Sequence, residues 1–134
     1  MKIVEVPMNI VTVPQGWYLV QAISADLNFE VGLPKLFNDI YHLEYRIDNA
    51  QIGEAIVVDN SISLVVKEST FDKADISDLC CSLQNLRSKC EEIGITKLAI
   101  PKLCCGNNGL LWKDVKTAVK GIFKGSNVFI MVCV

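Results

Sequence analysis

The sequence has little of what several common classes of protein require. It contains one histidine, few aromatic side chains (7% of its 134 residues), no CxxC spacing and no run of lysine or arginine. No apolar stretch approaches the roughly 20 residues that a membrane-spanning helix needs. The N-terminal segment also lacks the apolar run and small-residue cleavage site of a signal peptide. We therefore expect a cytoplasmic protein that makes no contact with membranes.

An excess of charge of either sign is equally lacking. The 13 Lys and Arg residues nearly balance the 15 Asp and Glu residues, for a formal net charge of -2. A protein that binds the backbone of a nucleic acid needs a concentrated positive face, so this class is not expected, although a single nucleotide could bind. The sequence is instead rich in hydrophobic residues, at 51%. A chain of this length buries roughly two-thirds of its unfolded surface, which predicts a single domain over residues 1–134.

Cysteine is abundant, but its spacing excludes the usual reasons for it. The six cysteines are Cys80, Cys81, Cys90, Cys104, Cys105 and Cys133. Two vicinal pairs without a CxxC fit neither a disulfide framework nor a zinc site, and His42 is the only histidine. We predict no bound metal and no cofactor, and expect most thiols to be buried in a reducing compartment. Cys104 and Cys105 are expected to be exceptions, because they lie in a turn.

The apolar pattern switches repeatedly between strand and helix periods. The expected strands cover residues 17–23, 54–59, 61–67, 97–100 and 128–134, the second and third as a hairpin or as two successive strands. The expected helices are a short one from Pro34, one from Asp75 to Gly94 and one from Val115 that Gly125 closes. This order predicts an α/β fold with three layers and a mixed central sheet covered by helices.

Three loops follow expected strands at the edge where α/β sheets bind ligands: residues 24–33, 67–74 and 101–110. In the third, small residues gather before a helix, where backbone amides can wrap a phosphate. The same residues also make ordinary turns. Gly32 is open to both interpretations, and Lys67 is either a solvated lysine, an anion ligand or a nucleophile.

Residues 23–37, 61–67 and 100–112 carry a more specific pattern. The first looks like an Ile-Ser-x-Asp segment followed by Met-Gly-Ala-Gly-Ile-Ala-x-x-Phe, the second like a strand that ends in lysine, and the third like Pro-Arg-Ile-Gly-Cys-Gly-Leu-Asp-x-Leu-x-Trp. In these segments the chain resembles the macro domain family of ADP-ribose binders, specifically its terminal ADP-ribose protein glycohydrolase type. The resemblance spans nearly the whole chain and implies a three-layer α/β/α macro fold with ADP-ribose in a cleft formed by these loops.

The resemblance also implies roles for individual residues. Lys67 matches the nucleophile that opens the distal ribose as a Schiff base, Ser24 matches a serine near that ribose, and Asn108 stands in place of the catalytic aspartate. The implied ligand-binding residues are Asn9, Ile10, Ile23, Ser24, Val31, Gly32, Leu33, Leu103, Cys104, Cys105, Gly106, Asn107, Asn108 and Gly109.

The chain departs from the family pattern at several of these positions. An amide at Asn108 cannot act as a general base. Asn9 replaces an aspartate that binds adenine, and Glu30 and Cys104 each add a side chain where the family has a phosphate-loop glycine. We therefore expect binding of ADP-ribose, of a related nucleotide derivative or of an ADP-ribosylated macromolecule, with weak or no turnover. The alternatives are a hydrolase that removes ADP-ribose through Lys67 and a degenerate macro fold used as an interaction module.

Overall fold

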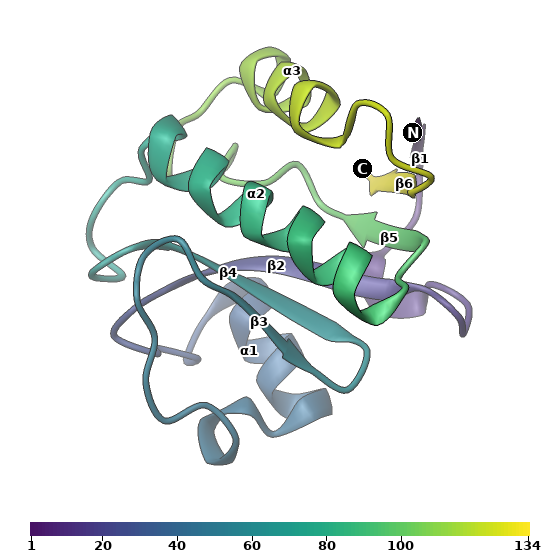
Figure 1. Cartoon of the computed structure of the whole chain (residues 1–134). Helices are drawn as coiled ribbons and strands as arrows, with labels where there is room; N and C mark the ends of the chain where they lie inside the picture. The colour runs from purple at the N-terminus through teal and green to yellow at the C-terminus, as the bar shows by residue number, and fades with distance from the viewer.

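The computed structural model describes all residues from 1 to 134, and helices and strands alternate along most of the chain (Figure 1). The strands are β1 (Lys2–Val6), β2 (Tyr18–Ser24), β3 (Ala55–Val58), β4 (Ser61–Lys67), β5 (Lys97–Ile100) and β6 (Phe129–Cys133). The α-helices are α1 (Gly32–Tyr41), α2 (Ile76–Ile93) and α3 (Trp112–Phe123), and the short 3-10 helices are η1 (Ile10–Thr12) and η2 (Leu43–Tyr45). None of the helices is long and apolar enough to span a bilayer.

The six strands form one sheet in the order β1-β6-β5-β2-β4-β3. All neighbouring strands are parallel except β3, which pairs antiparallel with β4. The predicted mixed sheet is therefore confirmed. Of the two interpretations of residues 54–67, the hairpin is right: Val58 pairs with Ser61, and Asp59 takes a φ of 53° in the turn between them.

Helices cover both faces of the sheet, with α2 and α3 on one face and α1 on the other (Figure 1). On the first face, a core of 21 buried residues includes Leu83 of α2 and Phe123 of α3. On the second face, a core of 14 buried residues includes Phe37 and Tyr41 of α1. The predicted three-layer α/β/α arrangement is confirmed, because apolar stripes at helical spacing pack on both sides of a sheet whose central strands are largely buried.

Local chemistry sets the ends of the helices. The Asp75 carboxylate caps α2 by accepting a hydrogen bond from the Ser77 N–H at 2.7 Å, and Gly94 ends it with a φ of 84°. Helix α1 begins two residues earlier than predicted, at Gly32, which leaves Pro34 in the first turn. Proline is tolerated there, because the first-turn N–H groups have no partner within the helix.

Strand β1 was not predicted from the sequence. It pairs in parallel with β6 along its whole length, and the Met1 ammonium donates to the Ser126 carbonyl at 2.6 Å. Strand β6 is therefore flanked by β1 and β5 rather than lying at the edge of the sheet.

The cysteines are less uniformly buried than expected. Cys90, Cys104 and Cys133 are buried, Cys80 and Cys105 are half-buried, and Cys81 is exposed. The expectation for Cys104 was wrong: although it lies in a turn, its side chain packs into the core beneath α2 and α3.

Candidate functional site

A cleft of about 380 Å³ lies at the carboxyl ends of β2, β4 and β5. Strand β2 pairs with β5 only at Tyr18 and Leu19, and then continues for five residues to Ser24 without that neighbour. Loops from all three strands and the first turn of α1 surround this opening. Its lining is made up of Ala22, Ile23, Ser24, Asn28, Val31, Gly32, Leu33, Pro34, Val66, Lys67, Thr70, Pro101, Lys102, Leu103, Cys104, Gly106, Asn107 and Asn108.

Most of the site residues predicted from the sequence meet in this cleft. Those that line it are Ile23, Ser24, Val31, Gly32, Leu33, Lys67, Leu103, Cys104, Gly106, Asn107 and Asn108. Asn9, Ile10, Cys105 and Gly109 do not. Asn9 is exposed and caps η1 through its side-chain oxygen, and Ile10 is buried in the core beneath α1. An adenine contact at Asn9 stays a prediction.

The Lys67 side chain is held at the cleft by three oxygen acceptors. Its Nζ donates to Asn108 Oδ1 at 2.9 Å, to the Asp72 carbonyl at 3.1 Å and to the Thr70 carbonyl at 3.2 Å. An ammonium group has three N–H donors, so these acceptors use all of them. In this arrangement Lys67 is a fixed hydrogen-bond donor, and nucleophilic attack would first require the release of at least one acceptor.

Asn108 links two of the loops that form the cleft. Its Oδ1 accepts from Lys67 and also from the Ala74 N–H at 3.1 Å. Because both contacts occupy the amide oxygen, the Nδ2 group is the part of the side chain that remains for a ligand. An aspartate here would offer a second anionic oxygen, whereas this amide offers a donor.

Ser24 and Thr70 form a hydroxyl pair beside Lys67, and Asp26 holds both. The Ser24 hydroxyl donates to Asp26 Oδ1 at 2.5 Å and lies 3.0 Å from Thr70 Oγ1. Thr70 donates its backbone N–H to Asp26 Oδ2 at 2.9 Å. Burial by itself would raise the pKa of Asp26, but these hydrogen bonds outweigh it and lower the pKa below its ordinary value. Sequence reasoning missed Thr70, which no motif marked, and only the fold places it beside Ser24.

Backbone conformation bears on one of the departures at the phosphate loops, Cys104. Cys104 adopts a φ of 60°, a left-handed conformation that glycine adopts without strain. Its side chain is buried in the core, where burial raises the pKa of the thiol to about 12, although the residue also lines the cleft. Gly32 has a φ of 68°, and a Cβ added to Gly106 would meet no atom within 4 Å.

Glu30 is not among the residues that line the cleft. Glu30 is exposed and lines a neighbouring cavity of about 360 Å³ together with Asp26, Asn38 and Glu44. The cleft itself is lined by two cations, Lys67 and Lys102, and by no aspartate or glutamate. Its electrostatics therefore suit an anionic ligand.

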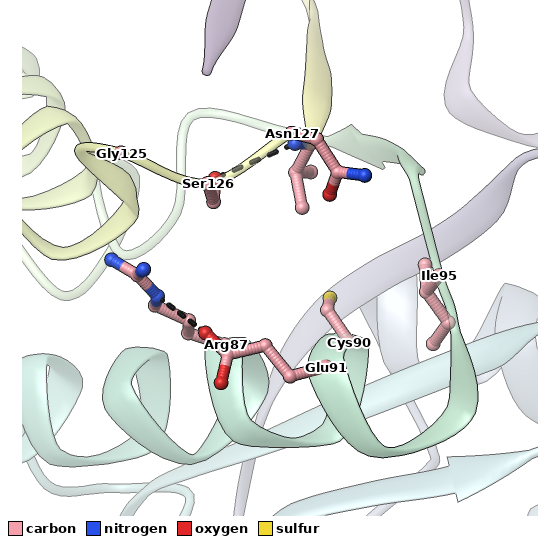
Figure 2. A pocket seen from close by; sticks show the side chains of 8 residues that line it. Arg87, Cys90, Glu91, Ile95, Gly125, Ser126 and Asn127 are labelled. Atoms are coloured by element: carbon pink, nitrogen blue, oxygen red, sulfur yellow. Dashed lines mark hydrogen bonds and ion pairs between the residues drawn. The ribbon is translucent and has the colours of Figure 1, made fainter.

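Another cavity, of about 290 Å³, lies between α2 and the segment that follows α3 (Figure 2). Arg87 of α2 donates to Glu91 at 2.8 Å and to the carbonyls of Ile122 and Lys124 at 2.7 and 2.8 Å. Cys90 is buried beside it, and burial raises the pKa of its thiol to about 11. Arg87 thus links α2 to the end of α3 through these hydrogen bonds.

Known proteins align with nearly the whole chain. No family model matches the sequence. The ADP-ribose glycohydrolase OARD1 of Bos taurus is 27% identical over 137 residues, which cover 98% of this chain and 90% of the relative, and its Homo sapiens counterpart is 26% identical over the same length. Among solved structures, the macrodomain of Mycobacterium tuberculosis DarG has a TM-score of 0.87 at 20% identity, covering 98% of this chain and 96% of that one. The macrodomain of Thermus aquaticus DarG has a TM-score of 0.85 at 19% identity, covering 98% and 97%.

Proposed function

The chain has the macrodomain fold and resembles the macro domain family along nearly its whole length, and from this premise we propose that it binds ADP-ribose. The ligand, or a closely related nucleotide derivative, would occupy the cleft at the ends of β2, β4 and β5, with weak or no turnover. The observation that carries the proposal is the lining of this cleft, which combines two lysines with Gly32 and Gly106 and contains no carboxylate. The pyrophosphate of ADP-ribose carries negative charge that this lining can accommodate.

The cleft offers backbone donors as well as lysines. Helix α1 begins at Gly32, and its first residues line the cleft. N–H groups in the first turn of a helix have no partner in the helix and bind anions well. A volume of about 380 Å³ also lies within the usual range for small-molecule sites.

The arrangement around Lys67 supports binding more than turnover. All three donors of the ammonium group are engaged, and the nearest side chain to Lys67 Nζ is an amide rather than a carboxylate. An amide cannot accept the proton that a general base must remove. Asn108 Nδ2 then serves as a donor to the terminal ribose of the bound ligand, while Lys67 holds the Asn108 oxygen in place.

Removal of ADP-ribose from a modified substrate is the second candidate function. Lys67 lines the cleft next to Ser24, and two relatives that align with nearly the whole chain are ADP-ribose glycohydrolases. In this candidate the Lys67 amine displaces the carrier's carboxylate from the anomeric carbon of the terminal ribose, and the carrier leaves as its carboxylic acid. Ring opening of the ribosylamine gives a Schiff base, which water hydrolyses to free ADP-ribose and the Lys67 amine.

Binding is tested by calorimetric titration of ADP-ribose into the wild type and into Gly106→Val. Gly106 lines the cleft, and a Cβ added to it would meet no protein atom within 4 Å, so affinity should fall at least about tenfold while the protein stays folded. Gly121→Val is the matched control, because Gly121 also has open space around it but lies on α3 outside the cleft. Undiminished affinity in Gly106→Val would exclude this cleft as the site.

The two candidate functions are separated by the Lys67→Ala variant. If the protein only binds, the variant should keep its affinity for ADP-ribose within about threefold, because the three donors of Lys67 bond to protein oxygens rather than to the ligand. The wild type should then release ADP-ribose from a modified protein no faster than Lys67→Ala does. Fast release that Lys67→Ala abolishes, with a borohydride-trapped adduct in the wild type alone, would establish the hydrolase instead.

Location and partners beyond the ligand stay predictions. All six cysteines are free thiols, which supports a reducing compartment such as the cytoplasm. The balanced charge supports a nucleotide-sized ligand rather than the backbone of a nucleic acid.

A further inference from the structure

Phe71 is the most exposed large apolar side chain of the protein. Its side chain lies 92% exposed, compared with 79% for Tyr45 and 67% for Leu111. A ring in this position contributes almost nothing to the core, since nearly all of its apolar surface stays in water.

The backbone that carries this ring is fixed next to Lys67. Phe71 lies between Thr70 and Asp72, and the carbonyls of both neighbours accept hydrogen bonds from Lys67 Nζ. Within the loop, Ser69 and Asp72 bond to each other through two N–H donors, each at 3.0 Å. The loop is thus tied to the floor of the cleft while the ring of Phe71 projects outward.

If the proposed function holds, Phe71 lies close to the group that carries ADP-ribose. In the proposed function the terminal ribose lies beside Asn108, next to Lys67. A group attached to that ribose would then leave the cleft near Thr70, which lines it and is followed directly by Phe71. A rigidly presented aromatic ring at that exit provides a large apolar contact at low entropic cost, because its loop is already ordered.

The charges near the ring favour one class of carrier. Glu68 and Asp72 are both exposed on the same loop as Phe71, and Asp26 holds the adjacent Thr70. Lys73 is exposed on this loop too, but its ammonium group is bonded to the Asn107 carbonyl. A phosphate backbone that passed the ring would meet these carboxylates, whereas a lysine or arginine side chain would be attracted by them. The surroundings thus suit a polypeptide better than a nucleic acid.

We propose that Phe71 recognises the polypeptide that carries ADP-ribose, with an apolar side chain of the carrier against the ring and a basic one beside Glu68 and Asp72. This inference rests on the proposed function. It adds a determinant of substrate choice that lies outside the nucleotide cleft.

The test compares the affinity of the wild type, Phe71→Ala and Tyr45→Ala for four ligands. These are free ADP-ribose, a peptide with ADP-ribose in a non-hydrolysable linkage flanked by leucine and arginine, the same peptide with glycine and glutamate instead, and an ADP-ribosylated single-stranded oligonucleotide. The wild type should bind the leucine-arginine peptide about five- to tenfold more tightly than free ADP-ribose, an advantage typical of one aromatic contact. Phe71→Ala should lose that advantage and still bind free ADP-ribose as the wild type does, while Tyr45→Ala should behave as the wild type throughout.

Each opposite result overturns the inference in a distinguishable way. Equal affinity of the wild type for both peptides and free ADP-ribose, or a preference for the oligonucleotide that Phe71→Ala removes, would refute a polypeptide contact at Phe71 while leaving the nucleotide site intact. Failure of the wild type to bind free ADP-ribose would instead refute the proposed function and this inference together.

Discussion

At the scale of single residues, the chemistry of the cleft depends on one atom of Asn108. Its Nδ2 group stands where a carboxylate would carry a second oxygen, so the Lys67 ammonium faces a neutral acceptor. Asn108 Nδ2 can hold a ribose hydroxyl by donating to it, while its oxygen stays bonded to Lys67. It has no group that could remove a proton from an attacking water.

Asn108→Asp should increase the release of ADP-ribose from an ester-linked substrate by about a hundredfold, because general-base catalysis typically contributes that much. The new carboxylate would lie within hydrogen-bond distance of Lys67 without any change in side-chain length. Single-turnover release is the measurement. Asn107→Asp is the matched control, since Asn107 also lines the cleft but makes no contact with Lys67, and its rate should stay at the wild-type level. An unchanged rate in Asn108→Asp would show that the carboxylate is not the missing group.

At the scale of elements, the cleft is kept in shape by contacts between loops. Asp26 ties the β2–α1 loop to the β4–α2 loop through Thr70, and Asn108 ties the β5–α3 loop to the start of α2 through Ala74. Lys73 adds a hydrogen bond from its ammonium group to the Asn107 carbonyl. Three loops that are far apart in the sequence thus form one surface.

The Asp26 contacts should make stability depend on pH. Its pKa is below the ordinary value in the folded protein, so its contribution is complete above the unfolded pKa of about 3.9 and is lost as the pH falls through the folded pKa. Asp26→Asn keeps an oxygen acceptor and removes the charge. The decrease in the free energy of unfolding between pH 6 and pH 3, measured in urea, should be smaller in this variant than in the wild type.

The control for this experiment is Asp39→Asn, which removes a carboxylate that is paired only with the exposed Lys35. It should lose as much stability on acidification as the wild type does. An Asp26→Asn variant with that same wild-type acid sensitivity would contradict the role assigned to Asp26.

Arg87 joins α2 to the end of α3 beside the second cavity (Figure 2). Arg87→Ala should lower the free energy of unfolding by about 1–2 kcal/mol, because the carbonyls of Ile122 and Lys124 lose their charged donor. Lys89→Ala, which removes only an exposed pair at 4.0 Å, should change it by less than about 0.5 kcal/mol. If urea titrations show that Arg87→Ala lowers the free energy of unfolding no more than Lys89→Ala does, the link between α2 and α3 does not contribute to stability.

At the scale of the whole molecule, two cores share a single sheet. Phe37 on the α1 side and Phe123 on the α3 side are both fully buried. Because the central strands contribute side chains to both cores, neither side can unfold while the other stays intact.

Phe37→Leu and Phe123→Leu should therefore each lower the free energy of unfolding by about 1–2 kcal/mol and leave one cooperative transition. Urea denaturation followed by both fluorescence and circular dichroism tests this. Leu36→Ala serves as control, since Leu36 is 45% exposed and its loss should matter little. Separate transitions for the two probes would contradict the prediction of a single domain over residues 1–134.

The sequence by itself determined the layers and most of the elements. Asp75 and Gly94 mark the ends of α2, the alternating strand and helix periods specify a covered sheet, and these signals are local. Strand β1 escaped prediction because a short edge strand is specified by its partner β6 rather than by its own pattern. The motif segments likewise located most of the residues that line the cleft.

Only the tertiary structure decided how those residues act. The Cys104 side chain is buried in the core, and Glu30 lines a neighbouring cavity. All three donors of Lys67 bond to protein oxygens, and Thr70 lies beside Ser24. A side chain's direction and its partners depend on backbone conformation and on residues distant in the sequence, here Ser24 and Thr70 or Lys67 and Asn108. The identities of such residues can be read along the chain, but their contacts exist only once the loops have met.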